Sequence, residues 1–343
     1  MNYTDSNVGE TDMTERENWL RLLRNDEPQW ITTPWEAFQG NFYADSFILD
    51  PIMAESKGVQ VVGNFKDQWG VTWRLPEDHK FPNPYINAEN KAIKNIKTWK
   101  EELQLPPLEG HDWTAAEKAA ASVDRNEFLA AVMLVGGLFE RTHYLMGFDD
   151  ALCNYMLEPD DMYELVGAIT EWKLDHLRQV IDHINPDVIL FHDDWGNKDN
   201  LFLPPDVWRQ IIKPHQIRIV DYVKSRDVIY LHHSDSFCEP IVEDMVEMGI
   251  DGWQGVIPQN PIPEIQKTLK GRMALIGGID AQIIDMAQAD EAAIRAEVRR
   301  CIDTYCPGGN FIPCIPNIVP IYPDVKAIYE DELKTYGSTF FRK

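Results

Sequence analysis

The sequence predicts an α/β fold in which parallel strands close into a barrel. From about residue 126 onward, short apolar β-branched runs alternate with stretches of helical periodicity, and this alternation repeats at least five times. No GxGxxG motif or P-loop opens any of these helices, which argues against a doubly wound nucleotide-binding sheet. A chain of 343 residues, 44% of them hydrophobic, is also long enough for one barrel with insertions.

The composition excludes several kinds of partner. Thirty-two basic against 56 acidic side chains give a formal net charge of −24, which repels nucleic-acid phosphates and anionic lipid headgroups. No stretch approaches the roughly 20 apolar residues of a membrane span, and the N-terminus has no signal-peptide pattern. Five cysteines are too few for a disulfide framework in a protein this long. We therefore expect a cytoplasmic protein that binds neither nucleic acid nor membranes.

The N-terminal part is expected to precede and interrupt the barrel. Residues 1–12 are polar and predicted to be flexible, and residues 13–343 are predicted to form a single barrel domain. Thr14 lies three residues before Glu17, a capping box that predicts an N-terminal helical extension. Residues 50–110 are irregular and rich in Pro, Trp and charge, which is typical of an insertion or lid.

The remaining elements follow from the hydrophobic pattern. A strand or hairpin is expected at residues 67–73. The predicted strands of the barrel are residues 131–135, 187–191, 227–231, 252–256, 273–276 and 310–312. The predicted helices between them are residues 162–184, 205–225, 240–248 and 291–305. Polar side chains cluster just after these strands, at the edge where the chemistry of such barrels takes place.

One such group has the residue types of a zinc site. His233 and Asp235 follow one strand, with His232 beside them, and Cys238 and Cys314 come later. Two or three N, O or S ligands and an open position are what catalytic zinc requires. The alternative is a structural one: one histidine is a buried core residue, the aspartate caps the next helix, and both cysteines are buried.

A second group offers acid–base chemistry. His192, Asp193 and Asp194 end one strand, and two adjacent carboxylates in a barrel mouth cannot both ionise cheaply. Because neighbouring residues of an extended segment point to opposite sides, only one of the two should face the cavity. Glu140 is a further catalytic candidate, with a structural ion pair to Arg141 as the alternative.

Other residues at the strand ends are candidates for substrate binding. His192 belongs to this set as well as to the acid–base group. Asp280 follows a Gly-Gly turn, where it would alternatively cap a helix. Trp195 and Trp253 lie beside the polar motifs and could form an aromatic wall, whereas the other tryptophans, including Trp69 and Trp73, are assigned to the core.

Several motifs together resemble a known family. They include ERENWL at 15–20, DQWGV at 67–71, DDWG at 193–196, HSD at 233–235 and GGID at 277–280. With these, almost the whole chain resembles the uroporphyrinogen decarboxylase superfamily, and especially its corrinoid-dependent methyltransferase branch. That branch contains methylcobalamin:coenzyme M methyltransferases and the methyltransferase I components of O-demethylases. The resemblance implies a TIM-like (β/α)8 barrel.

The resemblance also distinguishes between branches of the superfamily. The decarboxylases grip substrate carboxylates with an Arg-rich N-terminal loop, but residues 31–40 of this chain contain no arginine. The methyltransferases hold zinc on a His-x-Cys pair and a distant Cys. Here His233 matches the histidine, Asp235 stands where the first cysteine would be, and Cys314 matches the distant one. A carboxylate in place of a thiolate makes the site harder, which suits an oxygen or ether substrate.

The resemblance implies a zinc-dependent methyltransferase. It would move a methyl group between a small methylated compound, with a methoxylated aromatic favoured, and the cobalt of a separate corrinoid protein. Cobalamin would arrive on that partner, because the sequence has no Asp-x-His-x-x-Gly motif. The expected roles are as follows: His233, Asp235 and Cys314 as metal ligands; Asp193, Asp194 and Glu140 as catalytic groups; Trp195, Trp253, His192 and Asp280 as substrate contacts.

Several alternatives stay open at this point. Cys238, His232 or Glu140 could complete the metal site in place of Asp235, or no metal could be bound. A metal-free decarboxylase acting on a smaller acid would use one aspartate of the 193–194 pair. A non-catalytic binding barrel is the third possibility, and the His, Asp and Cys residues at successive strand ends argue against it.

Overall fold

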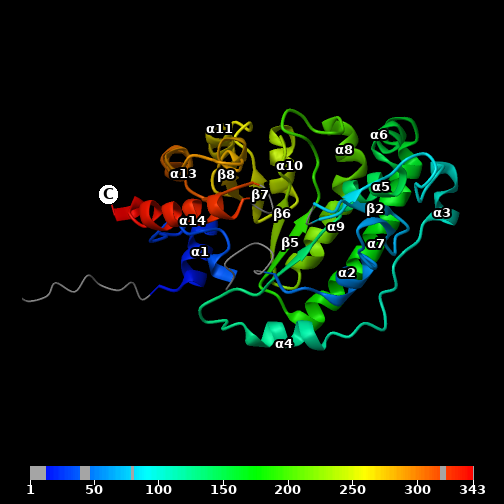
Figure 1. Ribbon diagram of the computed structural model, residues 1–343, viewed down its shortest axis with the longest axis horizontal. Helices are drawn as coiled ribbons and strands as arrows, with labels where there is room; N and C mark the ends of the chain where they lie inside the picture. The colour runs from blue at the N-terminus through cyan, green and yellow to red at the C-terminus, as the bar shows by residue number, and fades with distance from the viewer. Residues whose placement is uncertain (1–12, 39–46, 79–80, 317–321, 343) are drawn as a thin grey trace, which may run out of the picture.

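The structure is a computed structural model that describes residues 13–38, 47–78, 81–316 and 322–342 (Figure 1). The predicted flexible segment 1–12 lies outside these residues. In the described part of the chain, no helix is both long and apolar enough to cross a membrane.

Six parallel strands form the main sheet, in the order in which they occur along the chain. They are β4 (Ala131–Leu134), β5 (Val188–His192), β6 (Ile229–His233), β7 (Gly252–Val256), β8 (Ala274–Gly278) and β9 (Phe311–Cys314). Each of the six predicted strands is present, with ends within two residues of the prediction. Their alternation with helices confirms the predicted parallel α/β architecture.

Helices connect these strands, and a last helix follows β9. They are α5 (Leu138–Met146), α6 (Phe148–Leu157), α7 (Pro159–Ile184), α8 (Pro205–Ile211), α9 (Lys213–Lys224), α10 (Val242–Glu247), α11 (Ile262–Leu269), α12 (Ala281–Ile284), α13 (Glu291–Tyr305) and α14 (Pro323–Gly337). The single helix predicted at 205–225 is wrong, because two helices occupy that range. Pro214 accounts for the break, since it lies in the first turn of α9 and lacks the N–H that would continue the hydrogen bonding of α8.

The N-terminal helix α1 (Glu15–Arg24) begins as its capping box predicts. The Thr14 hydroxyl accepts a hydrogen bond of 3.1 Å from the backbone N–H of Glu17. The helix packs beside β8 and β9, so the N-terminal extension closes one end of the sheet.

A small antiparallel sheet follows helix α2 (Pro51–Ser56). Its strands are β1 (Gly63–Lys66), β2 (Thr72–Leu75) and β3 (Asn83–Pro84). The turn between β1 and β2 forms because the Asp67 carboxylate accepts backbone N–H bonds of 2.9 Å from both Trp69 and Val71. The predicted hairpin at 67–73 is thereby confirmed. Helices α3 (Trp99–Glu102) and α4 (Thr114–Ser122) lead from this sheet to β4.

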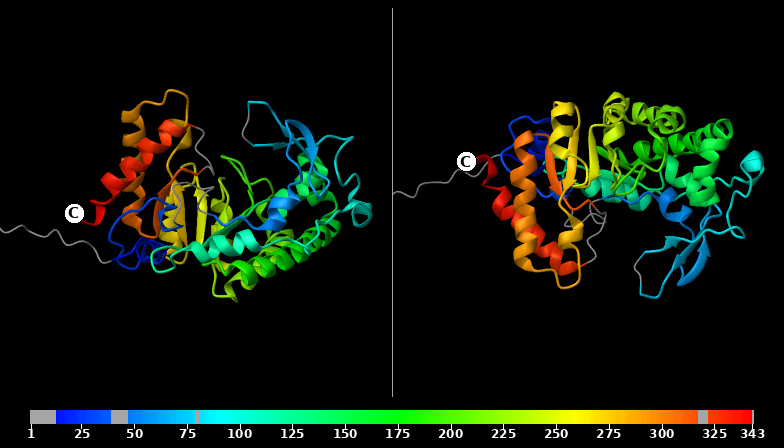
Figure 2. Two further views of the ribbon diagram at one scale, coloured as in Figure 1. Left: turned by 60° about the horizontal axis from the view of Figure 1, so that its bottom comes forward. Right: turned by 90° about the horizontal axis from the view of Figure 1, so that it is seen from above.

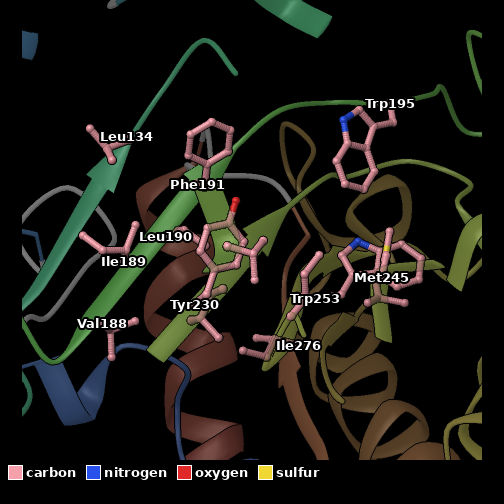
Figure 3. Close-up of a cluster of buried hydrophobic side chains, with 14 of the residues drawn as sticks. Leu134, Val188, Ile189, Leu190, Phe191, Trp195, Tyr230, Met245, Trp253 and Ile276 are labelled. Atoms are coloured by element: carbon pink, nitrogen blue, oxygen red, sulfur yellow. The ribbon is translucent and has the colours of Figure 1, made fainter. Parts of the chain in front are cut away.

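Helices α13 and α14 and the small sheet lie at opposite ends of the molecule (Figure 2). Figure 2 shows α13 and α14, in orange and red, at one end and the blue and cyan sheet β1–β3 at the other. Between them, apolar side chains of the strands and their helices form a continuous buried cluster, part of which is shown in Figure 3.

Candidate functional site

Strand register brings three predicted residues together. His192 and His233 end neighbouring parallel strands and are aligned in the sheet, so their rings lie on the same face and stack with centroids 4.3 Å apart. Asp194, two residues after His192, faces the same side. Its Oδ1 lies 3.8 Å from Nε2 of His233. One potential ligand atom from each of these three residues lies within 4.8 Å of the others.

Buried partners fix the orientation of both imidazole rings. Nδ1 of His192 lies 2.9 Å from Oε2 of Glu140, and Nδ1 of His233 is bonded to Oε1 of Gln254. Both bonds leave Nε2 for another partner. Nε2 of His233 is buried and has no hydrogen-bond partner within the described residues. Buried polar atoms are almost always paired, and metal-binding histidines show this pattern of a second-nitrogen bond to carboxylate or carbonyl oxygen.

The electrostatics of this group favour a cation. Burial would lower the pKa of His192, but Glu140, Asp194 and Asp235 outweigh it and raise that pKa to about 10. Burial raises the pKa of the Asp194 carboxyl well above its usual value; His192 opposes this rise, and Asp235 and Glu140 add to it. A divalent cation would relieve this concentration of carboxylates. Two imidazole nitrogens and a carboxylate oxygen are suitable donors for zinc, and the residues present therefore fit such an ion.

Asp193 has a different environment from Asp194. Its carboxylate accepts backbone N–H bonds of 2.8–3.0 Å from Leu138, Phe139 and Glu140, and a 3.0 Å bond from the indole of Trp195. It therefore anchors the first turn of α5, to which Glu140 belongs. The two adjacent carboxylates point to different surroundings, as the alternation argument predicts, but neither is among the residues that line the cavity described below.

The predicted ligands Asp235 and Cys314 do not join His233. Among the described residues, the close group contains His233 with His192 and Asp194 instead. The backbone N–H of Asp235 donates to Asp194 at 3.1 Å, while its side chain lines a cavity. The Cys314 thiol donates to the Ile315 carbonyl at 2.9 Å, and burial raises its pKa, which keeps it protonated. Cys314 ends β9, three strands from the strand that carries His233.

Trp195 and Trp253 are placed in the core, as Figure 3 shows. The Trp195 ring stacks on His232 with centroids 3.8 Å apart, and the Trp253 indole donates to the Ser234 carbonyl at 2.8 Å. Neither lines the cavity described below. His232 thus matches the alternative of a buried core histidine, held through Nε2 at 3.1 Å from the Asp193 carbonyl.

Two other candidates have structural partners. The Cys238 sulfur lies 3.6 and 3.5 Å from the hydroxyls of Ser234 and Ser236. Asp280 caps α12, where its carboxylate accepts a 2.9 Å bond from the N–H of Gln282. The alternative prediction of a helix cap at Asp280 is confirmed.

A cavity of about 710 Å³ lies beside His192. Its wall combines β4, α5 and α7 with α2 and the hairpin of β1 and β2, and Asp235 also lines it. Its large aromatic residues are Phe65, Trp69, Trp73, Phe81, Tyr144 and Trp172. Sequence reasoning assigned Trp69 and Trp73 to the core. Trp69 does belong to the buried core, at 1% exposed, and also lines the cavity, whereas Trp73 is only partly buried. Their position in the predicted lid is the signal that could have identified both tryptophans as residues of the cavity wall.

Comparison with known proteins identifies the family. The family model described as uroporphyrinogen decarboxylase matches residues 70–313, a range that includes His192, Asp194 and His233. The chain belongs to this family. Among solved structures, a methyltransferase from Methanosarcina mazei superposes with a TM-score of 0.63 at 13% identity, covering 97% of this chain and all of that one. The family membership of this chain and the fold that it shares with the methyltransferase confirm the predicted barrel fold class. No curated protein sequence matches the chain significantly.

Proposed function

We propose that this protein is a zinc-dependent methyltransferase that moves a methyl group between a small methylated compound and the cobalt of a separate corrinoid protein. The observation that carries the proposal is the group of His192, Asp194 and His233 beside an aromatic-walled cavity. In this group His192 and Asp194 are partly buried, and the buried Nε2 of His233 has no hydrogen-bond partner among the described residues. The similarity in fold to the Methanosarcina mazei methyltransferase supports it. The favoured substrate is a methoxylated aromatic compound.

The proposed ligand set differs from the sequence prediction. His233 is kept, and His192 and Asp194 take the places of Asp235 and Cys314. When bound, zinc would act as a Lewis acid that withdraws electron density from the ether oxygen of the methyl donor. Cobalamin on the partner protein would supply the methyl acceptor.

The protein's own residues would position the reaction. Glu140 and Gln254 hold the two imidazole rings, and Asp193 fixes the turn of α5 that carries Glu140. Burial raises the pKa of Asp235 to about 6, since Glu140 adds to the rise and His192 only partly offsets it. Asp235 lines the cavity beside the proposed ligands, and we assign to it the donation of a proton to the leaving oxygen. The tryptophans of the cavity wall would orient a flat ring.

Elemental analysis tests the ligand set. Wild type is expected to retain about one zinc per chain, whereas His233→Ala and Asp194→Asn lose it. Cys314→Ala is the matched control and should retain zinc, because its thiol lies outside the proposed group. Loss of zinc in Cys314→Ala together with retention in Asp194→Asn would overturn the ligand set.

Methyl transfer is tested directly. Zinc-loaded protein is incubated with a methoxylated aromatic compound and a corrinoid protein reduced to Co(I), and methylcobalamin formation is followed by absorbance. No methylcobalamin with wild type, over a panel of methoxylated, methylthiolated and methylated-amine donors, would contradict the proposal. Release of CO2 from a small acid by zinc-free protein would support the decarboxylase alternative, which the family's name favours.

A further inference from the structure

Two cationic side chains line the cavity, and neither is hydrogen-bonded to an anion among the residues that the structure describes, although Arg141 forms a loose ion pair with Asp67. Arg141 follows Glu140 on α5, and Lys173 comes from α7. Their residues are only 7% and 4% exposed, respectively. Buried charges are normally paired and hydrogen-bonded, so a hydrogen-bonded partner is expected for each of these two groups.

The guanidinium of Arg141 has unused donors. Its Nε and Nη1 are buried and have no hydrogen-bond partner among the residues that the structure describes. An Asp67 oxygen lies 3.7 Å from Nη1, which is beyond hydrogen-bond distance. The Asp67 carboxylate is instead occupied by the N–H groups of Trp69 and Val71 and by the indole of Trp73.

The ammonium of Lys173 also has more hydrogen-bond donors than hydrogen bonds within the described residues. It carries three N–H donors, and its hydrogen bond within the described residues is a long one of 3.5 Å to the Val135 carbonyl. Burial, helped by the nearby Arg141, lowers the pKa of Lys173 to about 7, although Asp193, Glu140 and Asp50 act in the opposite direction. An anion bound between the two cations would stabilise both of them.

We propose that Arg141 and Lys173 bind a carboxylate of the substrate, which makes the methyl donor a methoxylated aromatic acid. This inference rests on the proposed function for the methyl group and adds the chemical class of the substrate. A guanidinium presents its N–H donors in a planar fork that matches a carboxylate. Stacking over the Trp69 ring, at 4.3 Å from Cζ to the centroid, holds the Arg141 guanidinium in place.

The same helix links this anion subsite to the metal group. Tyr144 lies beside the guanidinium, at 5.7 Å from Cζ to the ring centroid, and its hydroxyl donates to Glu140 at 2.8 Å. Glu140 in turn holds His192. The carboxylate end and the methoxyl end of one ring would therefore occupy two points of one cavity, with Tyr144 and the tryptophans along its sides.

Calorimetric titration of chelator-treated protein tests the subsite. The probes are 4-methoxybenzoate and its neutral amide, 4-methoxybenzamide. Wild type is expected to prefer the acid, and Arg141→Met should weaken acid binding roughly 10- to 100-fold while amide binding changes less than about threefold. Arg74→Met is the matched control, because it removes an exposed guanidinium stacked on Tyr85 outside the cavity, and it should change neither affinity.

Lys173→Met provides a second variant in case Arg141→Met does not fold. It should also lower the ratio of acid to amide affinity. Wild type that binds the acid no better than the amide, or variants that lose both probes equally, would overturn the inference. The test is independent of the proposed function, since it uses neither metal nor corrinoid. Acid-selective binding without methyl transfer would reject the function alone, and transfer from neutral donors without acid preference would reject the anion subsite alone.

Discussion

Glu140 joins helix α5 to the candidate metal group through a single carboxylate. One oxygen holds Nδ1 of His192, and the other accepts the Tyr144 hydroxyl. Glu140→Gln keeps the shape of the side chain but removes the charge that orients and polarises the ring. We expect zinc affinity to fall roughly 10- to 100-fold, measured by competition with a chromophoric chelator.

Tyr144→Phe is the control for this substitution. It removes a hydrogen bond to the same carboxylate and leaves the bond to His192, so its effect on zinc affinity should be clearly smaller. Zinc affinity of Glu140→Gln equal to that of wild type would show that the Glu140 contact plays no part in metal binding.

Only part of the arrangement of the candidate site could be predicted from the sequence. The adjacency of Asp193 and Asp194 in an extended segment predicted that their side chains would point to opposite sides, and the bonds of Asp193 to the start of α5 agree with this. The choice of partners for His233 could not be predicted in this way. It depends on the alignment of β5 with β6, which is a long-range property of the sheet.

At the scale of the element, helix α5 is capped by the side chain of Asp193, the residue that directly follows β5. Its first N–H groups are satisfied by Asp193 in a fully buried environment, instead of by a residue of the helix itself. Asp193→Asn would turn one acceptor into a donor that faces these N–H groups. The free energy of unfolding in urea should fall by about 2–3 kcal/mol.

A solvent-accessible cap gives the comparison. Asp280→Asn at the start of α12 should cost less than about 0.5 kcal/mol, because asparagine caps helices nearly as well as aspartate. Equal losses in the two variants would show that the buried cap on α5 has no special importance.

Asp50 connects two helices and makes stability depend on pH. Its carboxylate caps α2 through the Met53 N–H at 2.8 Å and lies 2.7 Å from Nε2 of His176 on α7. Burial acts to raise the pKa of Asp50, but His176 and the Met53 N–H outweigh it and lower the pKa below 3.8. A lowered pKa contributes stability at pH values above 3.8, which is lost as the pH falls through the folded-state pKa.

Unfolding in urea at a series of pH values checks this contribution. The difference in unfolding free energy between wild type and Asp50→Asn should shrink as the pH falls from about 5 towards 3. A difference that stays unchanged over this range would show that the ionised carboxylate contributes nothing to stability.

The elements themselves were largely predictable, and the exceptions have local causes. Apolar runs located all six strands of the main sheet, whereas Pro214 divided one predicted helix into two. The part of the cavity wall formed by α2, β1 and β2 was expected only as an insertion or lid, and the surface that it covers could not be predicted, because irregular sequence contains no hydrophobic period. The assignment of Trp69 to the core is confirmed, but the contribution of Trp69 and Trp73 to the cavity wall was missed.

At the scale of the whole molecule, a ligand that binds only the folded chain must stabilise it. Zinc at about 100 times its dissociation constant should raise the free energy of unfolding by about 2.7 kcal/mol. His233→Ala should show no such increase at the same zinc concentration. An equal increase in both proteins would mean that zinc binds elsewhere on this acidic chain.

The alignment of β5 with β6 serves two purposes at once. It places Phe191 against His232 inside the core, and it places His192 against His233 at the site. A slip of one residue between the strands would therefore bury the wrong side chains and dismantle the donor set in the same step. On the proposed assignment, zinc retention reports strand registration, and a refolded preparation could be sorted into correctly and incorrectly paired molecules by its metal content alone.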